Sequence, residues 1–103
     1  MTYRIIETEL ALRDLESIIF YITSSLDNKA AATVFLDDVE KCYANLQTMP
    51  YMYNTCNAPR LRKLGFRKAF VKNYILVYRI DEQNGVVNIL RFFHKRQDYD
   101  RWL

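Results

Sequence analysis

Apolar positions at the start of the chain predict a strand followed by a helix. Residues 2–7, TYRIIE, form a short run of β-branched and aromatic side chains that favours a strand. Thr8 can cap a following helix, and Glu9 suits its first turn. Apolar side chains then recur at three- and four-residue spacing, which predicts an amphipathic helix to about Ser25: Ala11, Leu15, Ile18, Ile19 and Ile22.

A second helix is expected to restart at Asp27 or Asn28 and to end at Pro50. Its apolar positions alternate spacings of three and four, which is typical of a helix that packs lengthwise against a neighbour. They are Ala32, Phe35, Val39, Cys42, Leu46 and Met49. Because the link between the two helices is short, they are expected to form an antiparallel helical hairpin.

The pattern changes in the second half of the chain. Residues 51–59, YMYNTCNAP, have no period and predict a loop, and from residue 60 onward the chain has the pattern of β structure. Its three apolar runs are LGFRKAFV, YILVYRI and VVNILRFF. The pair Asn84-Gly85 readily supplies the positive φ angles of a tight hairpin turn between the last two runs. Lys72-Asn73 can turn the first pair, so the three strands form an antiparallel meander.

Together these elements predict a single α+β domain over residues 1–103. The N-terminal strand joins the meander in a four-stranded twisted sheet, the helical hairpin covers one face, and a short C-terminal tail or helix follows. Both faces of the sheet are apolar: in the last strand Val86, Leu90, Phe92 and His94 share one face, and Val87, Ile89, Arg91 and Phe93 the other. Antiparallel sheets usually leave one face exposed to solvent, so we expect a bound partner to cover part of the second face.

Composition restricts the class of protein. Half of the 103 residues are hydrophobic and 26% are charged, which is typical of one globular domain and not of a disordered chain. Cys42 and Cys56 form no CxxC and lack a second histidine for a zinc site, so we expect free thiols, no metal and no cofactor. Free thiols, the absence of an apolar signal core and the absence of an apolar run of about 18 residues predict a cytoplasmic protein without a membrane segment.

Charge is distributed unevenly along the chain. Eleven of the fifteen Lys and Arg residues lie in residues 60–103, which indicates a surface that faces a polyanion. The candidate nucleic-acid-binding residues are Arg60, Arg62, Lys63, Arg67, Lys68, Lys72 and Lys95, with Phe66, Phe70, Tyr74 and Tyr99 as platforms on which bases could stack. On a strand, Lys68 and Lys72 are expected to share a face and Arg67 to point away. The alternative is that these cations are solvated and protect an edge strand from pairing.

The end of the last strand carries the candidate catalytic residues His94, Arg96 and Tyr99. A histidine can move protons near neutral pH, and an arginine can stabilise the charge on an attacked phosphate. This combination suits metal-free RNA cleavage by the 2′-hydroxyl, whereas a lone histidine at a strand end is more often structural. A two-metal nuclease is not expected, because the helical carboxylates have no matching partners in the β half. Trp102 is interpreted as a hydrophobic anchor for the tail.

The order of these segments resembles a known family. A strand, a helical hairpin that ends near MP, a basic strand, NYILVYRID, an NG turn and VNILRFFHKRQDY resemble the RelE/ParE superfamily of toxins from bacterial type II toxin–antitoxin, or plasmid stabilisation, systems. The resemblance covers nearly the whole chain and implies two helices against a twisted sheet of about four strands. It also implies a cognate antitoxin that wraps the toxin and blocks its site. Operator DNA would be bound only through that antitoxin.

The superfamily divides by activity. RelE-like members cut messenger RNA in the ribosomal A site, and ParE-like members inhibit DNA gyrase without catalysis. The first function that the resemblance to RelE predicts is a ribosome-dependent endoribonuclease that inhibits translation. Arg67, Lys68 and Arg96 would bind the RNA backbone. His94 or Tyr99 would then handle the proton. We expect the basic residues and His94 to line one hollow.

One position departs from the RelE pattern. Ile75 stands where that pattern has an arginine, and the ILRFFHKRQD ending also resembles ParE endings. Gyrase inhibition is therefore the alternative function. A small RNA-binding module without toxicity is the further alternative.

Overall fold

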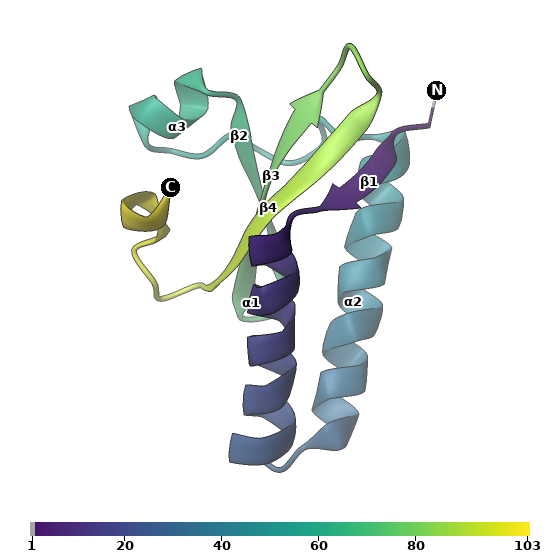
Figure 1. The fold of residues 1–103 in the computed structure, drawn as a ribbon, viewed down its shortest axis with the longest axis vertical. Helices are drawn as coiled ribbons and strands as arrows, with labels where there is room; N and C mark the ends of the chain where they lie inside the picture. The colour runs from purple at the N-terminus through teal and green to yellow at the C-terminus, as the bar shows by residue number, and fades with distance from the viewer. Residues whose placement is uncertain (1) are drawn as a thin grey trace.

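Four strands and a long helical hairpin make up the core of the computed structural model, which describes residues 2–103 (Figure 1). The regular elements, in chain order, are β1 (Arg4–Glu7), α1 (Glu9–Phe20), the π-helical turn η1 (Tyr21–Ser25), α2 (Lys29–Thr48), the short α3 (Pro59–Lys63), β2 (Phe66–Val71), β3 (Tyr74–Asp81), β4 (Val86–His94) and the 3-10 turn η2 (Tyr99–Trp102). Among these residues, no helix combines the length and the apolar character that a membrane crossing requires.

The sheet has the strand order β1-β4-β3-β2. β2, β3 and β4 form the expected antiparallel meander, and β1 pairs with β4 in parallel. The predicted α+β fold with a four-stranded sheet is therefore confirmed, and the sheet is mixed. A parallel partner for the last strand is possible because the whole helical hairpin lies between β1 and the meander.

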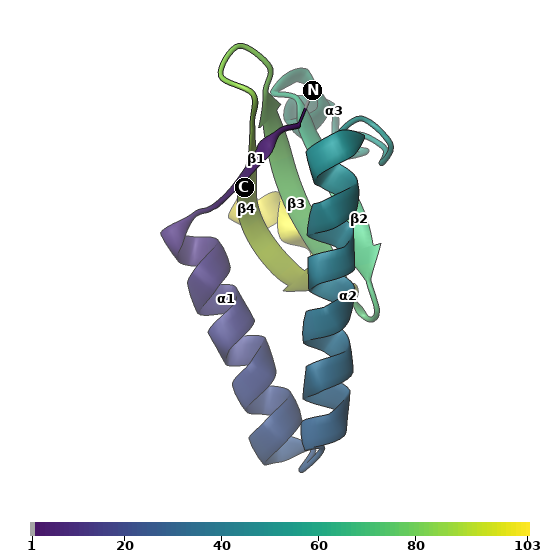
Figure 2. The ribbon, with the colours of Figure 1, turned by 90° about the vertical axis from the view of Figure 1, so that its right-hand side faces the viewer.

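Side-chain caps fix both helices of the hairpin where the sequence predicts them. Thr8 Oγ1 accepts a hydrogen bond from the backbone N–H of Ala11 at 3.1 Å, and Asn28 Oδ1 accepts one from Ala31 at 3.0 Å. The helical path continues through η1 to Ser25, as expected. Both views show that the tip of the hairpin extends well beyond the sheet (Figures 1 and 2).

The face of the sheet toward α1 and α2 holds the larger core. The predicted seam of α2 is buried, except that Met49 lies just after the helix and is 57% exposed. The seam packs with the buried side chains of the strands: Ala69, Val71, Leu76, Tyr78, Val87, Ile89 and Phe92. Tyr78 is fully buried, and its hydroxyl donates a hydrogen bond to the Pro50 carbonyl at 2.7 Å, which ties the end of the hairpin to the sheet.

The chain itself covers much of the opposite face, which leaves less apolar surface for a partner there than expected, although Phe70 is 64% exposed. A second core there contains Cys56, Leu61, Ile75, Val77 and Phe93, and Tyr99 and Leu103 of the tail pack against it. Its cover is built by Cys56, Ala58 and α3, Pro59–Lys63, which is a helix where β structure was expected. Pro59 at the first helical turn favours this start.

The tail is attached differently from the sequence-based interpretation. Trp102 is 65% exposed and does not anchor it. Leu103 and Tyr99 pack on the second core instead.

A β-bulge changes which residues of β4 share a face. Tyr78 pairs with Ile89 while Val77 pairs with Arg91, so Leu90 is an extra residue in β4. As a result Phe92 joins Val87 and Ile89 on the helical side, and Leu90 packs with Phe93 on the other side. The strict alternation predicted for this strand is therefore wrong beyond the bulge.

The two meander turns differ in how well they were predicted. Lys72 has φ +55° and turns β2 into β3, as expected. Between β3 and β4 only Gly85 has a positive φ, +64°, and the link spans four residues. The prediction of a tight turn at Asn84-Gly85 is therefore wrong in this detail. The Asp81 carboxylate accepts hydrogen bonds from the backbone and side chain of Asn84, and these bonds stabilise a longer turn.

Candidate functional site

Two of the predicted site residues meet on the face of the sheet away from the hairpin. Lys68 points there from β2, and its Nζ lies 5.8 Å from the ring centroid of Tyr99 and 6.0 Å from that of Phe70. The Tyr99 ring stacks on Phe93 at 5.9 Å. We call Lys68, Phe70, Phe93 and Tyr99 the Lys68 cluster. It offers one cation and an aromatic surface, a combination that suits a phosphate beside a base.

The Tyr99 hydroxyl in this cluster is a hydrogen-bond donor and not a base near neutral pH. Burial, with smaller effects of Cys56 and Asp100, raises the pKa of Tyr99 to about 12. Burial also raises the pKa of the neighbouring Cys56 thiol, although Tyr99 and Lys68 act in the opposite direction. The cluster can therefore hold a negative charge, but neither group readily accepts a proton.

His94 stands at a corner formed by the end of β4 and the residues after it. Its backbone N–H donates to Gln97 Oε1 at 2.7 Å, and its Nδ1 accepts from the backbone N–H of Arg96 at 3.1 Å. The bond to Nδ1 holds the ring in place and occupies one of its two nitrogens. The Arg96 side chain is exposed beside it. The His94 corner, which consists of His94, Arg96 and Gln97, thus places an imidazole and a guanidinium within one short turn.

The His94 ring and the Tyr99 ring lie on opposite faces of the sheet. His94 contacts Tyr74 edge to face at 5.4 Å, and Tyr74 packs on Phe35 of α2 at 5.2 Å. Tyr99 belongs to the second core with Phe93. The strand backbone therefore separates the two candidates for proton transfer. Ile75, at the position of the missing arginine, is 4% exposed in the second core and offers no group to a phosphate.

Two of the predicted arginines hold the chain together. The Arg60 guanidinium donates to the backbone oxygens of Asp100 at 2.8 Å and Leu103 at 3.0 Å. Arg67 points to the helical side, donates to the Tyr53 carbonyl at 2.6 Å and lies over the Tyr51 ring at 4.9 Å. Arg67 and Lys68 occupy opposite faces, as predicted. The structure therefore does not bring Arg67, Lys68 and His94 to one hollow.

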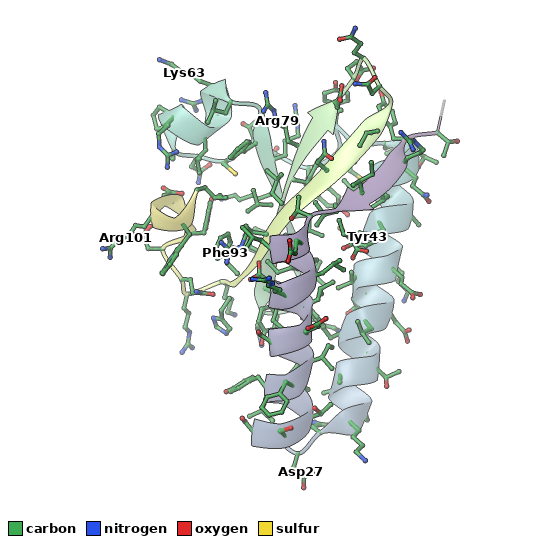
Figure 3. The ribbon with its side chains drawn as sticks, in the orientation of Figure 1. Asp27, Tyr43, Lys63, Arg79, Phe93 and Arg101 are labelled. Atoms are coloured by element: carbon green, nitrogen blue, oxygen red, sulfur yellow. The ribbon has the colours of Figure 1, made fainter. Side chains whose placement is uncertain are left out.

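The remaining cations are dispersed. Lys72 does not share the face of Lys68, because the turn at Lys72 interrupts the alternation and its Nζ lies 3.2 Å from Asp38 of α2. Arg62 and Lys63 are exposed on α3, and Lys95 is exposed after β4. Figure 3 shows Lys63 and Arg101 directed outward on the side of α3 and the tail, whereas Phe93 lies against the sheet.

Sequence reasoning missed Asp14, which holds the part of β4 just before the His94 corner. Asp14 of α1 accepts hydrogen bonds from Arg91 Nε at 2.8 Å, from the second Arg91 nitrogen at 3.1 Å and from the backbone N–H of Phe92 at 2.9 Å. Arg91 therefore supports the bulge and is not available to a polyanion. A signal was present in the sequence: Asp14 falls on the apolar stripe between Ala11 and Ile18, where a carboxylate needs a partner.

Solved structures share this fold over most of the chain. A chromosomal ParDE toxin–antitoxin system from P. aeruginosa matches with a TM-score of 0.69 and 18% identity, covering 90% of this chain and 96% of the other. A RelBE2 toxin–antitoxin complex from Mycobacterium tuberculosis matches with a TM-score of 0.63 and 25% identity, covering 91% and 99%. A mutant of E. coli RelE in the free state matches with a TM-score of 0.67 and 18% identity, covering 99% and 93%.

Comparison of the sequence with family models gives a more specific result. Residues 5–99 match the ParE toxin of type II toxin–antitoxin systems, parDE. No curated protein matches the chain. The match spans nearly every element from β1 to the start of η2, and it confirms the resemblance carried by the NYILVYRID and VNILRFFHKRQDY segments. This chain belongs to the ParE toxin family of type II toxin–antitoxin systems, within the RelE/ParE superfamily.

Proposed function

We propose that this toxin acts by binding DNA gyrase and catalyses no reaction. The observation that carries the proposal is the separation of His94 and Tyr99 by the sheet, in a chain that matches the ParE family over residues 5–99. Catalysis by a general acid and base requires both groups within hydrogen-bond reach of one reacting phosphate. A protonated Tyr99 on one face and an imidazole on the other do not meet that condition.

The surface for the target would be the side of the molecule that carries α3 and the tail. Trp102 is 65% exposed there, beside the exposed Arg101, and Arg62 and Lys63 project from α3. Tryptophan and arginine are the residues that most often dominate a protein interface. The tail is held by Arg60 and by the second core, so these side chains are presented on an ordered segment.

A supercoiling assay tests the proposal. Purified toxin is expected to block gyrase-catalysed supercoiling of relaxed plasmid, and Trp102→Ala with Arg101→Ala is expected to lose this effect while the protein stays folded. Leu26→Ala, which is also exposed but lies at the hairpin tip, serves as the control. Undiminished supercoiling at a large excess of folded toxin would refute the proposal.

We further propose a cognate antitoxin that covers the outer face of the helical hairpin. Leu12, Phe20 and Leu36 are exposed there beside Leu15 and Ile19, and Phe20 is 68% exposed. A large exposed apolar patch on a helix pair suits the apolar face of a partner helix. The structures of ParDE and RelBE2 are those of toxins with antitoxins, which supports such a partner here.

Co-expression with the antitoxin encoded beside this gene tests the docking surface. Phe20→Glu is expected to abolish co-purification, because it places a charge in an apolar interface. Ser17→Glu, one turn before Phe20, exposed and outside the apolar patch, introduces the same charge and is the control, expected to leave the complex intact. Retention of the complex by Phe20→Glu would place the antitoxin elsewhere.

A ribosome-dependent messenger RNA endoribonuclease is the second candidate function. The Lys68 cluster favours it, because Lys68 and the protonated Tyr99 could together hold and protonate a phosphate oxygen. Primer extension on messages from induced cells separates the two functions. New cuts at codon boundaries that disappear in Tyr99→Phe would support the nuclease, and unchanged messages with blocked supercoiling would support gyrase inhibition.

A further inference from the structure

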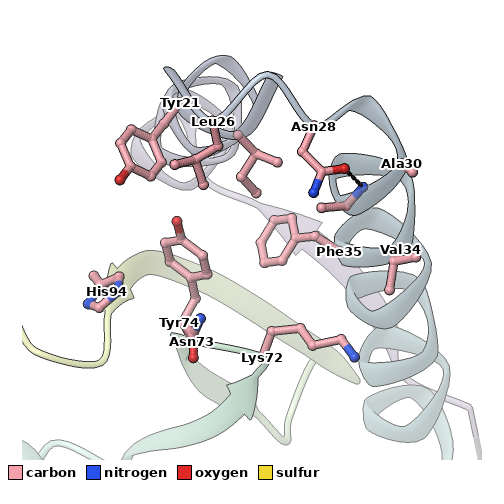
Figure 4. Close-up of a pocket in the computed structure, with 12 residues that line it drawn as sticks. Tyr21, Leu26, Asn28, Ala30, Val34, Phe35, Lys72, Asn73, Tyr74 and His94 are labelled. Atoms are coloured by element: carbon pink, nitrogen blue, oxygen red, sulfur yellow. Dashed lines mark hydrogen bonds between the residues drawn. The ribbon is translucent and has the colours of Figure 1, made fainter. Parts of the chain in front are cut away.

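An apolar pocket of about 600 Å³ opens where the tip of the hairpin overhangs the end of the sheet (Figure 4). Side chains of the hairpin form its apolar wall: Ile22, Leu26, Ala31, Val34 and Phe35. The opposite wall comes from the β2–β3 turn and the end of β4. Pockets that hold small organic ligands have volumes of about 300–1,000 Å³, so this one is large enough. Neither proposed function uses it.

Three polar groups stand on one side of this pocket. Tyr21 at the start of η1 and Tyr74 at the start of β3 direct their hydroxyl groups into the space between hairpin and sheet (Figure 4). The His94 ring also lines the pocket, 5.4 Å from the Tyr74 ring centroid. Within residues 2–103 the hydroxyls of Tyr21 and Tyr74 take part in no side-chain hydrogen bond, so both are available to a ligand.

All three groups can donate a hydrogen bond to the same ligand. Because His94 Nδ1 accepts from Arg96, the neutral ring carries its proton on Nε2. Burial, with a smaller effect of Tyr21, raises the pKa of the Tyr74 phenol, so that hydroxyl stays protonated near neutral pH. Lys72 is already paired with Asp38 and is not counted among the donors. No carboxylate occurs among the described residues that line the pocket.

We propose that the pocket binds a small organic acid with an aromatic or branched aliphatic body. Its carboxylate would accept hydrogen bonds from Tyr21, Tyr74 and His94, and its body would lie against Leu26, Val34 and Phe35. A carboxylate is a pure acceptor and matches a group of donors, whereas an alcohol offers a single weaker oxygen. The π-helical turn that positions Tyr21 agrees with a binding role. Such turns are rare in proteins, and those that occur are often found at functional sites.

Titration of the purified full-length toxin with three acids tests this assignment. The probes are indole-3-acetate, 4-phenylbutyrate and 4-methylpentanoate, each compared with the alcohol of the same carbon skeleton. Backbone amide shifts are expected to change around Ala31, Asn73 and His94, with each acid binding roughly tenfold more tightly than its alcohol, as for one charge-assisted hydrogen bond. Equal affinity for acids and alcohols, or no saturable binding of any acid, would overturn the proposal.

Variants then locate the site. Val34→Trp is expected to abolish binding, because the side chain of this exposed helix position would fill the pocket. Leu36→Trp, equally exposed on the outer face of the same helix, is the matched control and should bind normally. The double variant Tyr21→Phe/Tyr74→Phe removes both hydroxyls and keeps the rings. It is expected to weaken the binding of the acids about tenfold and to affect the binding of the alcohols less. Binding that survives Val34→Trp would overturn the assignment.

Discussion

The two faces of the sheet are both covered by the chain, but by different kinds of structure. Two regular helices pack along the face that contains Tyr78, whereas the other face lies under the short helix α3, the residues just before it and the tail. Each face contains fully buried side chains, such as Leu46 on the helical side and Leu61 on the other. The core under the irregular cover is smaller than the core under the helices, so this cover is expected to open locally at a lower free energy than the helical side.

Substituting a matched pair of leucines is the strongest test of this comparison. Leu46 and Leu61 are both 0% exposed. Leu46→Ala is expected to lower the free energy of unfolding by about 4 kcal/mol, because a cavity forms between rigid elements that cannot collapse into it. Leu61→Ala is expected to cost about 2 kcal/mol, since its short helix can shift to fill the space. Urea unfolding measures both, and equal losses would contradict the distinction.

The ion pair that joins α1 to the bulge gives the next largest effect. Arg91 and Asp14 are largely buried, so Asp14→Ala leaves a guanidinium and the Phe92 N–H without their acceptor. We expect a loss of about 3 kcal/mol in unfolding free energy, close to the range for a broken buried pair. Glu9→Ala removes the exposed partner of Arg13 in the same helix and should cost less than about 0.5 kcal/mol. Comparable losses of unfolding free energy in the two variants would show that the Asp14–Arg91 ion pair contributes little to stability.

The same contrast explains what could be predicted from the sequence. Helix and strand periods are local, so the hairpin, its caps at Thr8 and Asn28 and the meander were all recognisable. The order and spacing of the segments were enough to identify the RelE/ParE superfamily, whereas the ParE family became clear only from the match over residues 5–99. The bulge at Leu90 was not recognisable, because it depends on a carboxylate in a distant helix. Elements that are held by long-range contacts leave little local signal.

The candidate site was harder to predict for the same reason. Sequence reasoning placed Lys68 and Arg67 on opposite faces, but it gave no means to see that Tyr99 would return to Lys68. The tail reaches that position because Arg60 of an unpredicted helix binds its backbone. A cation in a basic run looks the same in sequence whether it binds a partner or its own chain.

The two cysteines provide one internal probe for each face. Both are buried, Cys42 on the inner side of α2 and Cys56 in the second core with the tail. Alkylation by iodoacetamide is expected to reach Cys56 first, because its cover opens locally. Arg60→Gln should accelerate the reaction of Cys56 about tenfold and leave Cys42 unchanged, since two hydrogen bonds to the tail are lost. Arg62→Gln on the same helix is the control, and equal acceleration of both thiols would indicate global unfolding instead.

The last test concerns the alkaline stability of the tail. Burial raises the pKa of Tyr99 from 10.0 to about 12. Between these values the unfolded chain has lost the Tyr99 proton while the folded chain retains it, so the contribution of this group to stability decreases as pH rises through that window. Tyr99→Phe cannot ionise, so its unfolding free energy should fall less steeply there than that of the parent protein. Buried tyrosines on the helical side, such as Tyr78, titrate alike in both proteins and cancel in the comparison. Parallel slopes would mean that the Tyr99 hydroxyl is already solvated, and hence that the irregular cover is open in solution.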